Sequence, residues 1–265
     1  MLNRLILTII ALMMVGRVSM AQTVTENKVF PVGEEFVLEA YYNLGFIWAK
    51  VGVANFKVGE DEHGNYDFRV KMDNLPKWDW LYEVHTNHHA VCTKSMKPLY
   101  MECDVKDNGA VYTDKYVFED KGDKNEIHRH RVTVRDSQKV AFDTVFIMQK
   151  EASDIINAIY IARNYLLMMK EQSPKPKDIP FYPLFGNGSH KIVGNIGDTT
   201  RIKTREGETY LCREYTASVG TGTIVAKDPI YAYLTDDERM IPVLVEAKLS
   251  IGNVKIYLKS YKVNK

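Results

Sequence analysis

The sequence predicts a mainly-β protein in which a curved antiparallel sheet, a half-barrel or open barrel, wraps one central α-helix. Three observations support this fold class. Many short runs alternate apolar and polar residues, turn signals separate those runs, and one helical segment is apolar on nearly all sides. The expected organisation is a signal peptide over 1–21 and a single domain over 22–265, comprising a strand-rich part 31–150, a helix 153–172, a Pro-rich connector 173–188 and a strand-rich part 189–265.

The first 21 residues have the three parts of a cleavable secretory signal. Arg4 gives a positive start, Leu5 to Val15 is an apolar run too short to span a bilayer, and Ser19-Met20-Ala21 is a small-x-small cleavage site. We therefore expect cleavage after Ala21, with no transmembrane anchor left. No cysteine lies near the site, so lipoprotein anchoring is not expected.

Composition excludes some partners and permits a large core. Without residues 1–21, which carry two arginines and no acid, 33 basic residues face 34 acidic ones. This balance gives no electrostatic reason to bind nucleic acid or an anionic membrane surface. A chain of this length can bury roughly 70–75% of its unfolded surface, so its core does not need disulfides.

Strands are predicted wherever apolar residues recur at every second position. In Tyr66 to Asp73, for example, Tyr66, Phe68, Val70 and Met72 share one face. The pattern recurs in Phe36–Tyr42, Tyr112–Phe118, Tyr210–Thr216 and Val254–Leu258. Turns are predicted at 63–65, 107–109, 121–123, 205–207 and 252–253, which carry Gly beside Asn, Asp, His, Lys or Glu. Short strands at this spacing indicate consecutive hairpins.

One segment has helical periodicity. Ser153 is the expected N-cap, Asp154 follows in the first turn, and apolar residues at helical spacing continue to about Gln172. The next segment, from Ser173 to Gly188, contains four prolines. Because proline cannot donate a backbone hydrogen bond, we expect an extended connector there and no central strand.

Three cysteines allow at most one intramolecular pair. If the turn-like stretch Lys94 to Pro98 makes a hairpin centred between Lys97 and Pro98, Cys92 and Cys103 lie opposite each other and could form a disulfide. The alternative, slightly favoured, is two buried thiols that pack as small apolar groups. Cys212 has no partner in either case.

No catalytic or metal motif stands out. On a strand, His85 and His89 share one face and His88 points the other way, so the three cannot hold one ion without a bulge. His128 and His130 share a face with Val132 and Val134, but no further ligand has a fixed spacing. Ser189 lacks the context of a nucleophile elbow. We therefore expect no metal, no cofactor and no catalytic residue.

Aromatic residues are the best candidates for ligand contact. Trp78, Trp80 and Tyr82 are spaced by two, so a strand would place three rings on one face, either as core or as a binding wall. Near the predicted rims, other aromatics could join them or cap the core. The candidate set is Trp48, Trp78, Trp80, Tyr82, Phe181, Tyr182 and Phe185.

Four stretches of the chain are distinctive when taken together. They are the opening Gly33-Glu34 with the strands after it, Lys97-Pro98-Leu99-Tyr100, the helix start Asp154–Tyr160 with Arg163, and the segment from Tyr233 through Glu238 to Val243. They resemble the exported bacterial proteins grouped as domain of unknown function 3108 and occur in that family's order. The resemblance implies an envelope-associated protein without an assigned activity and carries over no catalytic residue.

The leading functional hypothesis is a soluble periplasmic, non-enzymatic protein that binds an apolar or amphipathic envelope ligand. A second hypothesis is a protein- or glycan-binding module in envelope assembly. A third, less favoured, is an envelope hydrolase in which His128 or His130 approaches a carboxylate or Ser189. The sequence leaves the ligand, the partner and the oligomeric state open.

Overall fold

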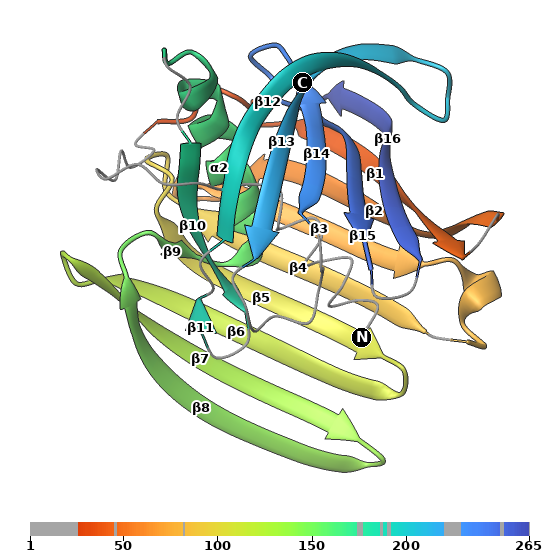
Figure 1. Ribbon diagram of the computed structural model, residues 1–265. Coiled ribbons are helices and arrows are strands. Elements are labelled where there is room, and N and C mark those ends of the chain that lie inside the picture. Colours follow the sequence, from red (N-terminus) through yellow and green to blue (C-terminus); the bar gives the residue numbers. More distant parts are fainter. Residues whose placement is uncertain are drawn as a thin grey trace.

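The computed structural model describes residues 26–44, 47–81, 83–173, 177–185, 188–189, 192–219, 229–249 and 252–264. These residues form one strongly curved sheet of sixteen strands around a single long helix, α2 (Ile155–Lys170), as Figure 1 shows. The predicted mainly-β fold is confirmed. The predicted signal peptide, 1–21, lies outside the described residues. None of the described helices has the length and hydropathy needed to cross a membrane.

The first half of the sheet is an unbroken antiparallel meander in which each strand pairs with the next. Its strands are β1 (Glu34–Leu44), β2 (Ile47–Glu60), β3 (Tyr66–Asn74), β4 (Val84–Cys92), β5 (Pro98–Asp107), β6 (Ala110–Asp120), β7 (Lys124–Arg135) and β8 (Gln138–Gln149). The 3-10 helix η1 (Pro76–Trp78) joins β3 to β4.

The second half continues the same sheet past β1, because the last strand pairs with the first. Its strands are β9 (Ala152–Ser153), β10 (Lys177–Phe185), β11 (Gly188–Ser189), β12 (Ile192–Lys203), β13 (Thr209–Val219), β14 (Ile230–Thr235), β15 (Pro242–Lys248) and β16 (Asn253–Val263). The path runs from β11 and β10 through β12 to β16, then from β1 to β8. Since β11 also approaches β8, the sheet is nearly closed.

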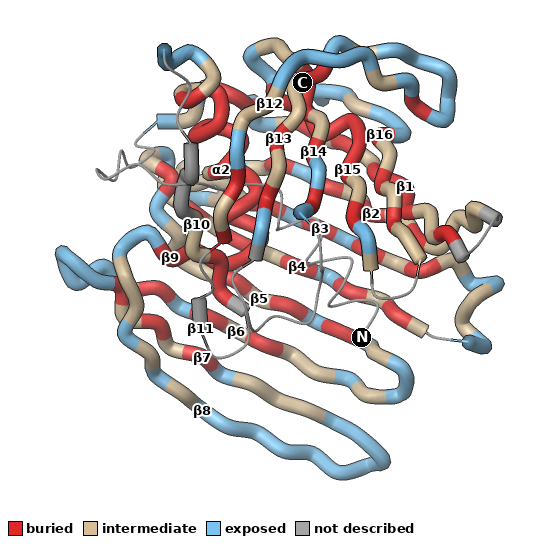
Figure 2. The backbone as a smooth tube through the Cα atoms, in the orientation of Figure 1, coloured by how far each residue is buried: buried red, intermediate tan, exposed pale blue. Residues whose placement is uncertain are grey.

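Alternation places one face of β3 in the core, as predicted. On β3, Phe68, Val70 and Met72 are buried and point inward, whereas Arg69 and Lys71 are exposed. Burial decreases along the meander, and the distal ends of β7 and β8 are largely exposed (Figure 2). The core therefore lies between the helix and the strands that surround it.

Helix α2 begins one residue later than predicted, because Asp154 rather than Ser153 is its N-cap. The Asp154 carboxylate accepts hydrogen bonds from the backbone N–H groups of Ile156 (2.9 Å) and Asn157 (3.0 Å). Ser153 instead belongs to β9. Nearly every residue of the helix is buried, including polar Asn157, Arg163 and Asn164. This all-round burial explains why the helix needs a curved sheet rather than a flat one.

The segment 173–188, predicted as an extended connector with no central strand, contains a strand near the end of the sheet. Residues 177–185 form β10, which pairs with β12 on one side and only with the two-residue strands β9 and β11 on the other. This place near the end of the sheet explains why Pro180 and Pro183 are tolerated. Few ladder hydrogen bonds are required there, so the missing N–H groups cost little.

The disulfide between Cys92 and Cys103 is not formed. Cys92 lies opposite Pro98 and Cys103 lies opposite His88, so the hairpin is centred about two residues earlier than the disulfide requires. Both are free, buried thiols, as is Cys212. Burial raises the pKa of all three thiols, that of Cys212 to about 12. The buried-thiol alternative is therefore the correct one.

Candidate ligand-binding site

The inner face of β3 to β8 is mostly apolar but carries a group of polar side chains. We call this group the inner polar cluster, and it consists of Thr86, His88, Cys103, Asp114, Arg129 and Arg131. Four of them form one row across neighbouring strands, in the order His88, Cys103, Asp114 and Arg131. A row of polar groups on the core face of a sheet is costly unless each group is satisfied.

Thr86 and His88 on β4 are not satisfied. The Oγ1 atom of Thr86 and the Nδ1 atom of His88 are buried, and neither has a hydrogen-bond partner in the described part of the chain. Their residues are 0% and 3% exposed. The strand neighbours of Thr86 are Met72 and Val105, which are apolar. The Cα atoms of the two residues are about 7 Å apart along one strand face, and each residue places an unpaired polar atom in the interior.

His88 is uncharged at neutral pH because burial lowers its pKa to about 4. Its Nε2 atom lies 3.7 Å from the Sγ atom of Cys103. Burial raises the pKa of that thiol, so it keeps its proton. A protonated thiol beside a neutral imidazole favours an S–H donor to Nε2, which leaves the imidazole proton on Nδ1. The unpaired Nδ1 is then a donor, beside a hydroxyl that can donate or accept.

The other half of the cluster is satisfied by charge pairing. The Asp114 carboxylate accepts from Arg129 Nε at 2.6 Å and Nη2 at 2.8 Å, and from Arg131 Nη1 at 3.0 Å. The Arg131 guanidinium also lies 4.2 Å from the Tyr112 ring centroid. Two arginines for one carboxylate leave this end of the cluster with a net positive charge. The cluster therefore combines a cationic end with neutral, unpaired hydrogen-bonding atoms.

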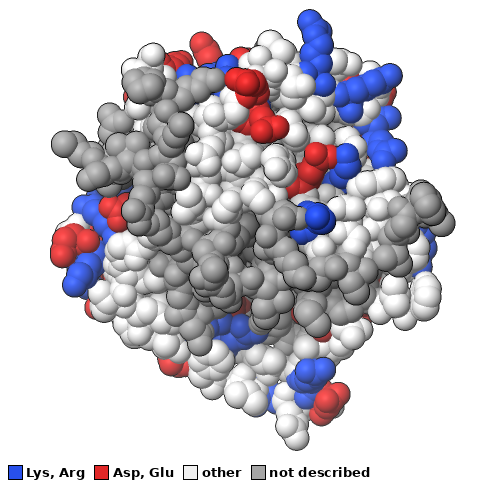
Figure 3. Space-filling view, in the orientation of Figure 1, with Lys and Arg blue, Asp and Glu red and all other residues white. Residues whose placement is uncertain are grey.

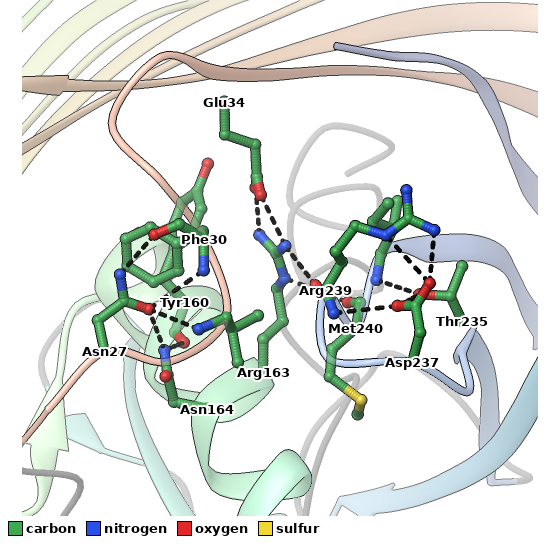
Figure 4. A network of polar contacts seen from close by, with 12 residues as sticks. Asn27, Phe30, Glu34, Tyr160, Arg163, Asn164, Thr235, Asp237, Arg239 and Met240 are labelled. Carbon is green, nitrogen blue, oxygen red and sulfur yellow. Dashed lines mark hydrogen bonds and ion pairs between the residues drawn. The ribbon is translucent and has the colours of Figure 1, made fainter. Parts of the chain in front are cut away.

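A second buried polar group fixes the helix to the sheet, and we call it the helix latch (Figure 4). Arg163 of α2 binds the Glu34 carboxylate of β1 through Nη1 (2.7 Å) and Nη2 (2.8 Å). It also donates to the backbone oxygens of Arg239 (2.8 Å) and Met240 (3.2 Å) in the β14–β15 turn. Both charged side chains are at most 1% exposed, and they are fully paired with each other.

Three of the four stretches that carry the family resemblance meet at the helix latch. Glu34 comes from the Gly33-Glu34 opening, Arg163 from the helix, and the two carbonyls from the turn that follows Tyr233–Glu238. Gly33 has φ of +90°, and a Cβ atom there would lie 2.1 Å from the backbone oxygen of Asn264. Only glycine fits this approach. These motifs therefore help to hold the fold together.

The predicted aromatic set does not form one surface. Trp78 lies in η1 and donates from Nε1 to the backbone oxygen of Lys50 at 2.8 Å, and Trp80 follows in a turn and is 79% exposed. The expected strand with three rings on one face was therefore wrong, because Pro76 begins a 3-10 turn instead. Tyr82 lies outside the described residues. Trp48 on β2 is half-buried, with Lys255 Nζ 5.6 Å from its ring.

The remaining aromatics lie near the helix. Phe181 of β10 packs edge-on against Tyr165, with ring centroids 5.8 Å apart, so it caps the core. Tyr182 is half-buried and lies opposite Ala152. The side chain of Phe185 lies outside the described residues. Figure 1 shows β10 beside α2, across the view from the β3–β4 connection that carries Trp78 and Trp80.

The histidines lie as the alternation predicts. His85 and His89 face outward and contact Asp73 (2.8 Å) and Asp67 (3.0 Å), whereas His88 faces inward. His128 and His130 lie on the outer face of β7, within 2.9 Å of Glu126 and 2.8 Å of Asp143. Each has a carboxylate, but their side chains are 44% and 46% exposed on a strand face. The side chain of Ser189 lies outside the described residues.

Among the described residues, two groups of side chains have ligand atoms close enough to hold a metal ion. They are Asp79, Glu83 and His85, and Glu119, Glu126 and His128. In both groups the acids already have other partners. Lys106 binds Glu83 at 2.6 Å and Lys121 binds Glu119 at 2.6 Å. On the face shown in Figure 3, acidic and basic side chains are interspersed and lie mostly toward the periphery.

Sequence reasoning missed most of the inner polar cluster, although a signal was present. The predicted strand of Tyr112 to Phe118 places Asp114 on the same face as Tyr116 and Phe118. In the same way, Thr86 and His88 have the phase of Val84 and Ala90. A polar residue at an apolar position of an alternating strand is the pattern that would have identified them.

One comparison with a solved structure supports the fold. A β-barrel-like protein of domain of unknown function DUF1849 from Brucella abortus matches with a TM-score of 0.56 at 8% identity, covering 89% of this chain and 100% of that one. An exported protein with YmcC-like fold from Bacteroides fragilis has a TM-score of 0.33 at 9% identity, covering 91% of this chain and 99% of that one. At such identities the likeness concerns the fold alone. No curated protein matches the sequence.

The family of this chain is identified by a sequence match. The family described as protein of unknown function (DUF3108) matches residues 38–259, which include every described strand from β2 to β15 and the helix. This chain therefore belongs to the DUF3108 family.

Proposed function

We propose that this protein is a non-enzymatic binding protein of the bacterial periplasm that holds an amphipathic ligand against the inner face of β3 to β6. The observation that carries the proposal is the pair of buried, unpaired atoms Thr86 Oγ1 and His88 Nδ1 in an apolar wall. Leaving such atoms unpaired costs roughly 1–3 kcal/mol each. A ligand that hydrogen-bonds to them would offset this cost.

The chemistry of the wall indicates which polar group would bind. Because His88 is neutral and its Nδ1 is a donor, it suits an uncharged acceptor such as an ester, amide or hydroxyl oxygen. The Thr86 hydroxyl can complete the same contact. Met72, Val105 and Val70, which neighbour these two residues across the sheet, suit an apolar chain. Among the described residues, no carboxylate contacts His88, which favours binding over general acid–base catalysis.

Native mass spectrometry with ligand extraction tests this proposal. Protein purified from bacteria should carry a lipid-sized mass, and the bound molecule should be released by organic solvent. The same protein should take up cis-parinaric acid as a fluorescent apolar probe. Thr86→Val and His88→Leu should lower occupancy about tenfold each, because each removes a hydrogen bond that the ligand alone satisfies.

The matched control is Thr199→Val, which makes the same substitution on the exposed surface of β12 and should leave occupancy unchanged. Wild-type protein that carries no extra mass and does not bind the probe would refute the proposal.

A second candidate function is docking of a glycan or an envelope protein, and Trp80 favours it. Its side chain is 79% exposed beside Leu81, which is 64% exposed, on the β3–β4 connection. Exposed indole rings commonly stack on sugars or anchor interfaces. Trp80→Ala should then abolish capture of peptidoglycan fragments or envelope proteins, without changing the lipid-sized mass bound inside.

A further inference from the structure

Strand β8 is the one long strand at an end of the described sheet, and half of it is uncovered. Residues 138–143 are all exposed, whereas Phe146 and Met148 farther along pack against the core. Val140 and Phe142 are 59% and 41% exposed although they are apolar. In the described part of the chain, no strand pairs with the outer edge of β8. Long open edges of this kind readily pair with another chain.

The hairpin between β7 and β8 determines which backbone groups are free. Arg135 lies opposite Gln138, and the two-residue loop between them, Asp136-Ser137, has φ of 49° and 64°. In such a hairpin the flanking residues exchange hydrogen bonds, and every second residue does so along the strand. Even-numbered residues of β8 therefore bond to β7. Lys139, Ala141 and Asp143 point their N–H and C=O groups away from the sheet.

We propose that two copies of this chain pair antiparallel through the exposed half of β8, with the two-fold axis at Ala141. This register uses the free backbone groups of 139, 141 and 143. It places Lys139 of each copy opposite Asp143 of the other, and Val140 opposite Phe142. Opposite charges directly across a strand pair stabilise it, and so do apolar pairs.

Neighbouring registers are less favourable. An axis at Asp143 places the two Asp143 carboxylates opposite each other, which repels. An axis at Phe142 places Lys139 opposite Val145 and Asp143 opposite Ala141, so neither charge has a partner. On the outer face, Lys115, His130 and Asp143 already form a row across neighbouring strands, in which His130 binds Asp143 at 2.8 Å. The Ala141 register adds Lys139 of the second copy to the end of this row. Charge complementarity therefore selects one register.

Cysteine cross-linking tests the register. In an antiparallel pair, facing hydrogen-bonded residues have Cα atoms about 5.5 Å apart, within the range of a disulfide. Ala141→Cys should give a disulfide-linked dimer under mild oxidation. Thr199→Cys, at an exposed strand position on β12, is the matched control and should stay monomeric. The three native cysteines are buried and contribute little background.

Charge exchange tests the pairing without any covalent bond. Sedimentation of the full chain should show a concentration-dependent dimer, and Lys139→Glu or Asp143→Lys should weaken it about tenfold. The Lys139→Glu/Asp143→Lys double variant should return to within about threefold of wild type, because the opposite charges face each other again. Circular dichroism verifies that each variant folds.

Two results would overturn the inference. One is a wild-type protein that stays monomeric throughout the concentration series while Ala141→Cys cross-links no faster than Thr199→Cys. The other is a double variant that is weaker than both single variants, which would place the dimer contact elsewhere.

Discussion

The helix latch and the inner polar cluster are both buried on the same sheet, but they differ in whether their polar atoms have hydrogen-bond partners. In the latch, Arg163 and Glu34 make two direct hydrogen bonds, and two backbone oxygens accept further hydrogen bonds from Arg163. In the cluster, Asp114 is equally well paired with two arginines, but Thr86 Oγ1 and His88 Nδ1 have no partner in the described part of the chain.

This difference separates a structural role from a binding role. A fully paired buried group holds elements in place, and here it joins α2 to β1 and to the β14–β15 turn. An unpaired buried group stabilises nothing by itself and lowers stability until something binds it. The same physical rule assigns the latch to the fold, and it is the reason for proposing a ligand at Thr86 and His88.

The largest expected effect comes from breaking the latch on one side. Arg163→Met leaves the Glu34 carboxylate buried without a partner, so the free energy of unfolding should fall by about 3–5 kcal/mol. Urea unfolding followed by circular dichroism measures it. Lys121→Met, which removes an exposed partner of Glu119, should cost no more than about 1 kcal/mol. Equal losses in the two variants would contradict a structural role specific to the latch.

The next largest expected effect is the loss of stability in acid, which should depend on His88 in the inner polar cluster. Burial lowers the folded-state pKa of His88 to about 4, against 6.5 for an ordinary histidine. The stability that depends on neutral His88 is therefore present above pH 6.5 and is lost as the pH falls through 4. It amounts to about 3 kcal/mol. Unfolding by urea at pH 7 and at pH 4 should show that His88→Leu loses less stability than wild type.

The control for this prediction is His63→Leu, which alters an exposed histidine in the β2–β3 turn. It should keep the full acid sensitivity of wild type. If His88→Leu and wild type respond equally to acid, His88 is not held neutral by its surroundings.

A smaller effect is expected at the start of the helix. Asp154 is another buried polar group with partners, since it accepts from the N–H groups of Ile156 and Asn157. Asp154→Ala should lower the free energy of unfolding by about 1–2 kcal/mol, the usual cost of losing an N-cap. Ser153→Ala should cost less, because Ser153 does not cap the helix. A larger loss of unfolding free energy for Ser153→Ala than for Asp154→Ala would mean that Ser153 is the N-cap, as the sequence predicted.

The sequence predicted more of the fold than of the site. Alternation and glycine turns are local signals, so the strand at Tyr66–Asp73 and the turn at 63–65 were predicted correctly. The N-cap was misplaced by one residue because Ser153 and Asp154 both suit that position. Trp78, Trp80 and Tyr82 match a strand pattern, and only Pro76 argued for a turn. The meeting of Glu34 with Arg163 depends on tertiary packing, which no local pattern contains.

The smallest expected effect is that of Thr86→Val, and its sign is opposite to that of the same substitution at Thr235. Thr235 accepts from the N–H of Ile241 at 2.9 Å and donates to Asp237 at 2.7 Å, whereas the hydroxyl of Thr86 has no partner in the described residues. Thr235→Val should therefore lower the free energy of unfolding of ligand-free protein by about 1–3 kcal/mol, since it leaves paired groups unsatisfied.

Thr86→Val keeps the β-branched shape and removes an unpaired hydroxyl, so it should raise the free energy of unfolding by about 0.5–1 kcal/mol while it lowers ligand occupancy. Thermal unfolding of delipidated proteins measures both. A loss of stability in delipidated Thr86→Val would mean that its hydroxyl is already satisfied within the fold, and Thr86 would then belong with the latch.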